Sequence, residues 1–394
     1  MDPAAATQAW LDSVPAEKRA KSDAYFEGGY WLILWNFLLA AAVMLLLLVS
    51  GVSVSLRAFG ERSTRFRFLQ PLLYAVPFML ITLLLTFPLT IYQDFIRDHA
   101  YGLSTQSFSS WLSDHLKQAA VTIIAFSILI VVLYSVFRHA QRTWWVWAAG
   151  VLTLFTIIGT MIAPVYIAPL TNKYKPLADP KIRDPILRMA RANEIPVNQV
   201  YEFDASRQTN RISANVSGFL NTTRISLNDN LLAQCSLPEI REVMAHEMGH
   251  YVLNHGAKLV MYSAILNFFT FAAMWWLFNG VMKRRGERWQ LRGIADPAAL
   301  PLLVLIFATI SFLLTPISNS VIRITEREAD AFGINAGREP DGMAKVALKL
   351  GSYRKLNPAP LEEFIFFDHP SGRARIRMAM DWKAANLPAA ESNR

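Results

Sequence analysis

Two histidines four residues apart, with a glutamate beside the first, form the sequence His-Glu-Met-Gly-His at residues 246–250. On a helix the imidazole rings of His246 and His250 lie about 40° apart and one turn displaced, so both face one point. Neutral imidazoles are good ligands for Zn²⁺, and Glu247 beside that point could accept a proton from an attacking water. The pattern predicts a hydrolytic zinc site. The alternative is a solvated helix face that carries two histidines.

The segment before the histidines has the features of a helix start. Ser236 is followed three residues later by Glu239, which is the signature of a capping box. We therefore expect a helix that begins just before the motif. His255 lies five residues beyond His250, off the shared face, and we expect it to be an ordinary surface or interfacial histidine.

A catalytic zinc needs a third protein ligand and one open position. Glu326 is the candidate, in a segment that we expect to continue as a helix from the apolar stretch before it. Asp330, one turn later, could accept a hydrogen bond from the outer nitrogen of a ligand histidine. Glu328 points about 160° away from Asp330 and is the weaker candidate. The alternative is a surface helix with charges spaced one turn apart.

Composition and gaps in charge indicate a membrane protein. The 394 residues are 53% hydrophobic and 18% charged, and the single Cys235 excludes an internal disulfide. Six windows lack Asp, Glu, Lys and Arg, and each has the roughly 20 residues needed to cross a bilayer as a helix. Buried helices of a soluble protein rarely run so far without a polar stripe, which favours membrane spans. The windows are 28–56, 68–93, 118–137, 143–172, 259–282 and 297–322.

The windows divide the chain into five parts. We expect a polar N-terminal arm over residues 1–29, without the apolar stretch of a signal peptide. Four membrane helices follow within 30–172, and two more within 259–322. The polar segments 173–258 and 323–394 fall on the same side of the membrane as the arm. They can therefore meet as the two halves of one catalytic domain.

The first of these polar segments also shows local structure. Asp179 followed by Pro180 is typical of a helix start, and a short amphipathic helix is predicted there. Partly alternating apolar residues over 198–206, 211–219 and 223–231 predict two or three strands of a small antiparallel sheet.

These motifs resemble those of the M48 zinc metalloproteases, and among them the Ste24 endopeptidases, also called CAAX prenyl proteases. The resemblance covers about residue 28 to the C-terminal region and rests on "RISANVSGF" (211–219), "AHEMGH" (245–250), "EREAD" (326–330) and "FFDHPSGRARI" (366–376). It implies one Zn²⁺ held by His246, His250 and Glu326, with Glu247 as the catalytic base and Asp330 as a supporting residue.

The resemblance also implies residues beyond the metal. His369 would be a further active-site residue, and Arg375, six residues later, a basic position that contacts substrate. The segment around Asn215 would be the edge strand along which a peptide substrate lies, which agrees with recognition by β-strand addition. The family pattern has seven spans, whereas here the polar arm takes the place of the first.

The sequence as a whole predicts a mainly α-helical, polytopic membrane protein with a zincin-like metalloprotease domain that contains the small antiparallel sheet. Expected substrates are peptides or proteins, prenylated or membrane-associated, cut near one end. Basic clusters beside the spans suit membrane lipids and positive-inside topology rather than nucleic acid. The distribution of basic residues in the loops places the catalytic domain on one side of the membrane, whereas the resemblance places it on the other. The sequence therefore leaves the side of the catalytic domain open.

Two other functions remain alternatives. One is an HtpX-like protease of the same family that removes damaged membrane proteins, although such relatives have fewer spans before the metal motif. The other is a transporter or binding scaffold that contains zinc. The absence of charged residues from the six windows argues against a transporter, because ion pathways usually need one.

Overall fold

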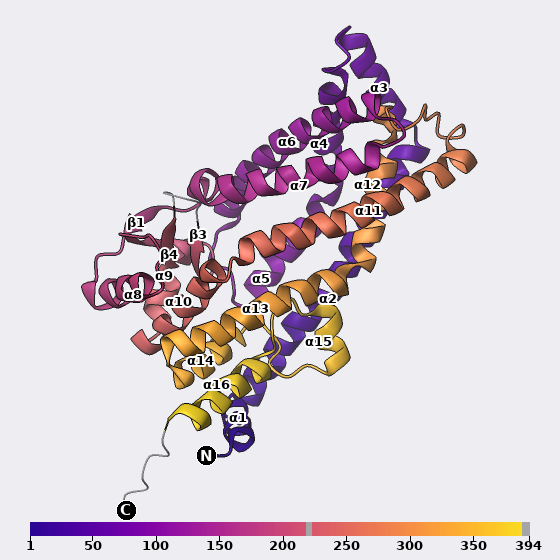
Figure 1. Cartoon of the computed structure of the whole chain (residues 1–394). Coiled ribbons are helices and arrows are strands. Elements are labelled where there is room, and N and C mark those ends of the chain that lie inside the picture. Colours follow the sequence, from indigo (N-terminus) through magenta and orange to yellow (C-terminus); the bar gives the residue numbers. More distant parts are fainter. Residues whose placement is uncertain (218–222, 388–394) are drawn as a thin grey trace, which may run out of the picture.

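Long apolar segments form helices that run side by side over much of the molecule (Figure 1). The computed structural model describes residues 1–217 and 223–387. A π-helical turn, Tyr92–Ile96, joins α4 (Gln70–Ile91) to α5 (Arg97–Ala100), and another, Ala163–Ile167, follows α7 (Trp144–Ile162). The long helices and their extensions are α2 (Ala16–Val49), α4 (Gln70–Ile91), α5 (Arg97–Ala100), α6 (Phe108–His139), α7 (Trp144–Ile162), α11 (His255–Arg285), α12 (Leu300–Leu313) and α13 (Thr315–Gly337).

Five helical segments of the described chain are long and apolar enough to cross a membrane. A sixth span results when Pro297–Leu313 and Thr315–Gly337, which are bent by 56°, count as one. The six predicted windows correspond to these segments. Apolar side chains cover their outer faces, such as Leu84 with 71% exposed and Trp276 with 70%. Such faces are stable in contact with lipid rather than water.

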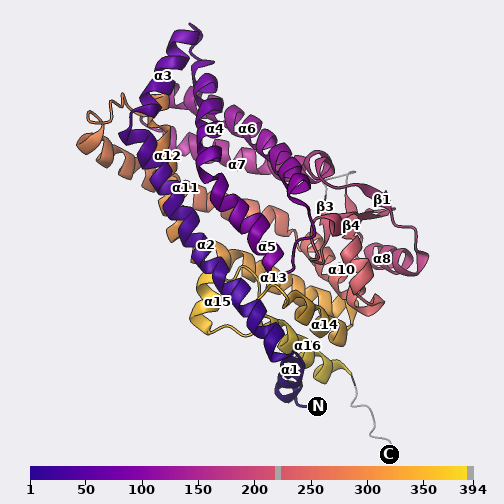
Figure 2. The same ribbon diagram turned by 180° about the vertical axis from the view of Figure 1, so that it is seen from behind.

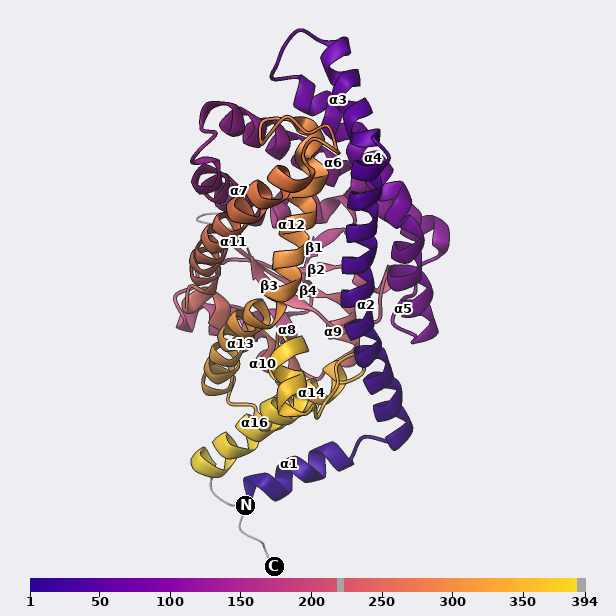
Figure 3. The ribbon, with the colours of Figure 1, turned by 90° about the vertical axis from the view of Figure 1, so that its right-hand side faces the viewer.

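The N-terminal residues differ from the predicted polar arm. The helix α1 (Pro3–Asp12) packs on the C-terminal helix α16 (Gly372–Asn386), and Leu11 is buried in a cluster with Ile376. Because α2 begins at Ala16, the expected boundary at residue 29 lies inside a helix. Figure 3 shows α1 lying below α16, at one end of the molecule. The arm is therefore packed structure that lies against the C-terminal helix of the chain.

The first span also ends earlier than residue 56. Gly51 has φ 76°, in the left-handed region that glycine adopts without steric cost, and the chain changes direction there. The next helix, α3 (Val52–Ser63), lies at the end of the molecule away from the sheet (Figure 2). Window 28–56 thus covers parts of two helices.

The sheet has four strands in the order β1-β2-β4-β3. They are β1 (Tyr174–Pro176), β2 (Val200–Phe203), β3 (Ala214–Ser217) and β4 (Arg224–Asn228). The pairs β1–β2 and β3–β4 are antiparallel, but β2 and β4 run parallel. The predicted antiparallel sheet is therefore wrong in this detail and the sheet is mixed, because β3 takes the edge and leaves β4 beside β2. Residues 218–219 of the expected strand 211–219 lie outside the described residues.

The remaining helices pack on the sheet, on α13 or on one another. The helix α8 has the predicted start, since the Asp179 carboxylate accepts a hydrogen bond from the Lys181 backbone N–H. The helix α10 packs on β3 on one side and on α13 on the other. These helices are α8 (Pro180–Ala192), α9 (Asp229–Gln234), α10 (Leu237–Val252), α14 (Pro340–Leu350), α15 (Pro360–Phe366) and α16.

Candidate active site

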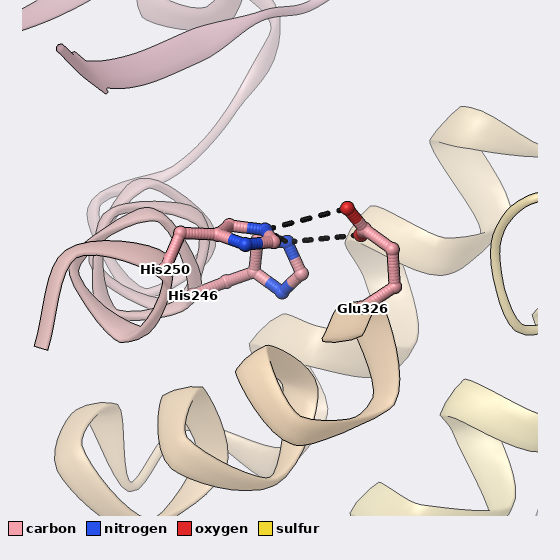
Figure 4. Close-up of side chains that lie close together, drawn as sticks. All are labelled: His246, His250 and Glu326. Carbon is pink, nitrogen blue, oxygen red and sulfur yellow. Dashed lines mark hydrogen bonds and ion pairs between the residues drawn. The ribbon is translucent and has the colours of Figure 1, made fainter. Parts of the chain in front are cut away.

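Helices α10 and α13 approach each other closely because glycines face their contact. A Cβ atom on Gly333 of α13 would lie 3.1 Å from the His246 backbone nitrogen. A Cβ atom on Gly249 of α10 would lie 3.3 Å from the Cα atom of Ala329. Side chains at these positions would push the helices apart. The close contact brings Glu326 of α13 against the histidines of α10 (Figure 4).

The start of α10 agrees with the predicted capping box. The Glu239 carboxylate accepts a hydrogen bond of 2.7 Å from the Ser236 backbone N–H, and the Lys349 ammonium lies 2.6 Å from its other oxygen. These contacts satisfy an N–H group that a helix start would otherwise leave unpaired. The first turn of the helix is thereby fixed two turns before His246.

Three side chains converge on one point. The Nε2 atoms of His246 and His250 lie 3.1 Å apart, and the Glu326 carboxylate oxygens lie 3.3 Å from the first and 3.4 Å from the second. Ligand atoms bound tetrahedrally at about 2.0–2.1 Å from a Zn²⁺ ion would be separated by about 3.3 Å. The three donors therefore fit a zinc ion without rearrangement, and their chemistry is that of a His₂Glu site.

The hydrogen bonds of His246 leave the correct nitrogen free. Its Nδ1 atom lies 2.9 Å from the Asp330 carboxylate, which accepts and cannot donate, so Nδ1 carries the proton. The Nε2 atom of the neutral ring is then an available ligand. Asp330 itself pairs with Arg375 at 2.9 Å, and Arg375 also donates to Glu326 at 3.2 Å. Burial alone would raise the pKa of the Asp330 carboxyl, but the Arg375 charge and the hydrogen bond from His246 lower it and keep Asp330 ionised.

His250 is supported by a second chain of hydrogen bonds. Its Nδ1 atom lies 2.9 Å from the Nδ1 atom of His255, whose Nε2 atom lies 3.1 Å from the Glu328 carboxylate. Since Glu328 can only accept, His255 donates through Nε2 and accepts through Nδ1. His250 must then donate through Nδ1, which leaves its Nε2 free for a metal. Lys258 pairs with the same Glu328 carboxylate at 2.8 Å.

This chain corrects the expectation for His255. Only 1% of its side chain is exposed, so it is not a surface histidine. Burial lowers the pKa of His255, which favours the neutral ring that the chain requires. Glu328 does not join the metal cluster, in agreement with its ranking as the weaker ligand candidate, but it orients His255.

Glu247 lines the same pocket as the ligands and is half-buried. Burial raises the pKa of its carboxyl. A carboxyl with a raised pKa is a better proton acceptor when ionised, and it holds a proton more readily afterwards. The position suits the base that the sequence predicts.

His369 also reaches the cluster. Its Nε2 atom lies 3.3 Å from a Glu326 oxygen, and its Nδ1 atom lies 2.8 Å from the Asp368 carboxylate. The loop between α15 and α16 thus adds a second imidazole, beside that of His246, to the wall of the pocket. Asp368 was not singled out from the sequence. Its place directly before His369 is the signal that could have identified it.

The two predicted substrate-binding residues are placed differently from each other. Arg375 is 8% exposed and already pairs with Glu326 and Asp330, so its contacts support the metal ligands. Asn215 lies on the edge strand β3, opposite Ser226 of β4, as predicted. It lines a neighbouring hollow between the sheet and the ends of α6 and α7. Within β3, it is Ala214 that lines the metal pocket.

Sequence reasoning also missed Glu242, one turn before His246. It is 4% exposed, and its Oε2 atom has no hydrogen-bond partner among the described residues. Burial raises the pKa of Glu242 to about 8. The carboxyl lies against Gly333 and Gly337 of α13, where the absence of side chains leaves room for it. The sequence alone gives no signal for a buried carboxyl at this position.

Comparison with known proteins decides the family. The model of peptidase family M48 matches residues 176–383, which is more than half of the chain. The chain belongs to peptidase family M48. The segment before it, residues 4–173, matches a family described as CAAX prenyl protease N-terminal, five membrane helices. Within these residues the structure has four candidate spans.

Individual relatives agree with this assignment. An uncharacterised metalloprotease of Bacillus subtilis, YhfN, is 33% identical over 87% of this chain and 80% of its own length. CAAX prenyl protease 1 of Saccharomyces cerevisiae is 25% identical over 77% of this chain and 70% of its own. The crystal structure of Ste24p from S. mikatae matches with a TM-score of 0.72 at 18% identity, covering 96% of this chain and 94% of that one.

These findings settle the class of the protein. It is an integral membrane metalloendopeptidase with several spans, and its fold is that of the S. mikatae protein. Its substrates are peptides or proteins, and its catalysis depends on a metal.

Proposed function

We propose that the protein is a zinc endopeptidase of the CAAX prenyl protease type, which cuts polypeptides near their ends. The observation that carries this proposal is the group of three metal-ligand side chains with its two supporting series of hydrogen bonds. It lies in a chain whose N-terminal segment matches the CAAX prenyl protease N-terminal family. The match over residues 4–173 favours this type over an HtpX-like protease. A transporter or scaffold does not require a free metal position beside a half-buried glutamate.

One Zn²⁺ per chain is the metal that suits the donors, and His246, His250 and Glu326 would hold it. When bound, zinc polarises a carbonyl group and makes water a nucleophile at neutral pH. Asp330 and His255 keep the ligand rings in the tautomers that binding requires. Arg375 offsets the charge of the two carboxylates on this side of the site.

Glu247 is the proposed general base and acid. It accepts the proton of the attacking water and then passes that proton to the nitrogen of the leaving group. His369 is held through Nδ1 by Asp368, and a second proton on Nε2 would let it donate to the developing oxyanion. The substrate would add to the free edge of β3 beside Ala214, where backbone groups can pair with an extended peptide.

The surrounding spans suggest which substrates reach this site. Extended tails and lipid-modified ends can enter a pocket that α10, α13, α14 and β3 line beside the membrane helices, whereas folded proteins cannot. Lipid-modified peptides and membrane lipids are therefore the proposed partners, and nothing in the basic segments beside the spans calls for nucleic acid.

The test compares a farnesylated C-terminal CaaX peptide with its unprenylated counterpart, using the full chain purified in detergent. Zinc content and cleavage are measured for the wild type, for Glu247→Gln, and for Glu287→Gln as a matched exposed control. We expect cleavage of the prenylated peptide only, abolished by Glu247→Gln with zinc retained and unchanged in the control. Equal cleavage of both peptides would indicate a general membrane endopeptidase, and zinc binding without cleavage would indicate another substrate or a scaffold.

A further inference from the structure

Arg354 stands in the loop between α14 and α15 and lines the metal pocket together with His369 and Arg375. It also lines a second hollow on the side of Phe26 and Lys355. Its guanidinium makes no hydrogen bond or ion pair with the part of the chain that the structure describes. The guanidinium lies 6.0 Å from the centroid of the Tyr353 ring, and the charges of Arg375, Asp368 and Glu326 act on it without a direct ion pair.

The other cations around these hollows are neutralised. Arg375 pairs with Glu326 and Asp330, and Lys355 pairs with Glu27 and Glu362 at 2.6 and 2.8 Å. Burial and then the charge of Arg375 lower the pKa of Arg354, yet an arginine in a protein stays protonated. Arg354 therefore presents to the pocket a guanidinium whose donors bind no anion directly, while the carboxylates of Asp368 and Glu326 act on its charge from farther away.

The loop that carries Arg354 is held in place. The Ser22 hydroxyl of α2 donates to the Arg354 carbonyl at 3.3 Å, and the Arg373 backbone N–H donates to the Leu356 carbonyl at 2.8 Å. Tyr353 lies under the Arg211 guanidinium at 5.3 Å. The guanidinium thus starts from a fixed backbone while its own donors stay free, which is the arrangement of a preformed binding group.

We propose that Arg354 binds the α-carboxylate at the C-terminus of the substrate, which makes the pocket selective for peptide bonds close to a chain end. The proposal rests on the endopeptidase function proposed above. The planar guanidinium fork matches both oxygens of a carboxylate, and a few residues beyond the cut reach about 10 Å in extended form. An acidic side chain offers the same chemistry, so the experiment must separate the two.

Three peptides of one sequence separate them: a free acid, a C-terminal amide, and an amide with aspartate as its last residue. We expect wild-type kcat/KM to be roughly 10- to 100-fold higher for the free acid, as for a hydrogen bond to a charged group. Arg354→Gln should bring the free acid down to the level of the amide and leave the amide unchanged. Arg354→Lys should keep part of the preference. Arg188→Gln, an exposed arginine on α8 outside the pocket, is the matched control.

Equal cleavage of acid and amide by the wild type would overturn the proposal while leaving the endopeptidase function intact. An equal loss on both peptides in Arg354→Gln would assign the residue a structural role. Cleavage of the aspartyl amide at the rate of the free acid would show that Arg354 recognises acidic side chains rather than the α-carboxylate. If no peptide is cleaved, the proposed function as a protease of the CAAX type fails. In that case the Arg354 proposal is tested by the binding of labelled free-acid and amide peptides to the Glu247→Gln protein, measured by fluorescence anisotropy. Tighter binding of the acid supports the proposal, and equal binding overturns it.

Discussion

Replacing His255 by leucine should weaken zinc binding without removing a ligand. The N–H···N contact of 2.9 Å fixes the proton of His250 on Nδ1 while Nε2 faces the metal. Leucine fills the buried space but cannot accept, so the metal-bound state would contain a buried donor without a partner. Such a group costs about 1–3 kcal/mol, which corresponds to roughly a 10- to 100-fold loss of zinc affinity. The metal-free state escapes most of this cost, because its ring can change tautomer.

Competition with a chelator of known affinity measures the loss directly on the metal-free protein in detergent. Lys258→Gln is the matched control, because Lys258 pairs with Glu328 but does not touch His250 or His255. Its side chain is 39% exposed, so the pair contributes less than about 1 kcal/mol and zinc affinity should change little. If His255→Leu binds zinc as tightly as the wild type and melts at the same temperature, the tautomer argument is refuted.

Three further outcomes follow from the same geometry. Burial raises the pKa of Glu242 from the ordinary 4.5 to about 8, so the folded metal-free protein keeps a proton that the unfolded chain loses. The protonated carboxyl therefore contributes to the stability of the fold below about pH 4.5, and this contribution is lost as pH rises through 8. Glu242→Gln should therefore raise the melting temperature by at least about 3 °C at pH 8.5 and little at pH 5, and an equal shift at both would contradict this. Gly333→Ala should weaken zinc binding, because its Cβ would lie 3.1 Å from the fixed His246 backbone nitrogen. Gly280→Ala is the matched control, because nothing lies within 4 Å of the added Cβ, and equal affinities of the two variants in the competition assay would contradict the packing argument. Removing zinc with a chelator should abolish cleavage and lower the melting temperature, and one equivalent per chain should restore both.

Much of the site follows from local spacing. Helical periodicity alone places the rings of His246 and His250 on one face, and the structure brings Glu326 to them as the sequence predicts. The capping residues before α10 and α8 also mark their helix starts correctly. Charge gaps predict the spans because a bilayer excludes charged side chains from any helix that crosses it.

The predictions that were wrong concern features that local sequence patterns do not determine. His255 was placed on the surface by extending the helix of His250, but α10 ends at Val252 and Asn254 adopts φ 55°. The new helix α11 begins at His255 and turns that ring inward. Strand direction is also nonlocal, since nothing within 200–203 and 224–228 states that these strands run parallel. Glu242 lies against glycines of α13, and Arg354 reaches the metal pocket from the loop after α14, and spacing along the chain cannot reveal either position.

The bend between α12 and α13 shows how the membrane part shapes the metal site. Pro316 follows Leu314 and Thr315 at the break, and proline disfavours helical geometry in the residue before it. Glu326 lies twelve residues beyond Leu314, about 18 Å along the helix. Without the bend of 56°, a straight continuation would carry Glu326 about 17 Å away from its place beside α10. The third ligand therefore reaches the two histidines because the last span breaks at Leu314, inside the apolar window 297–322, which a count of apolar residues treats as one continuous helix.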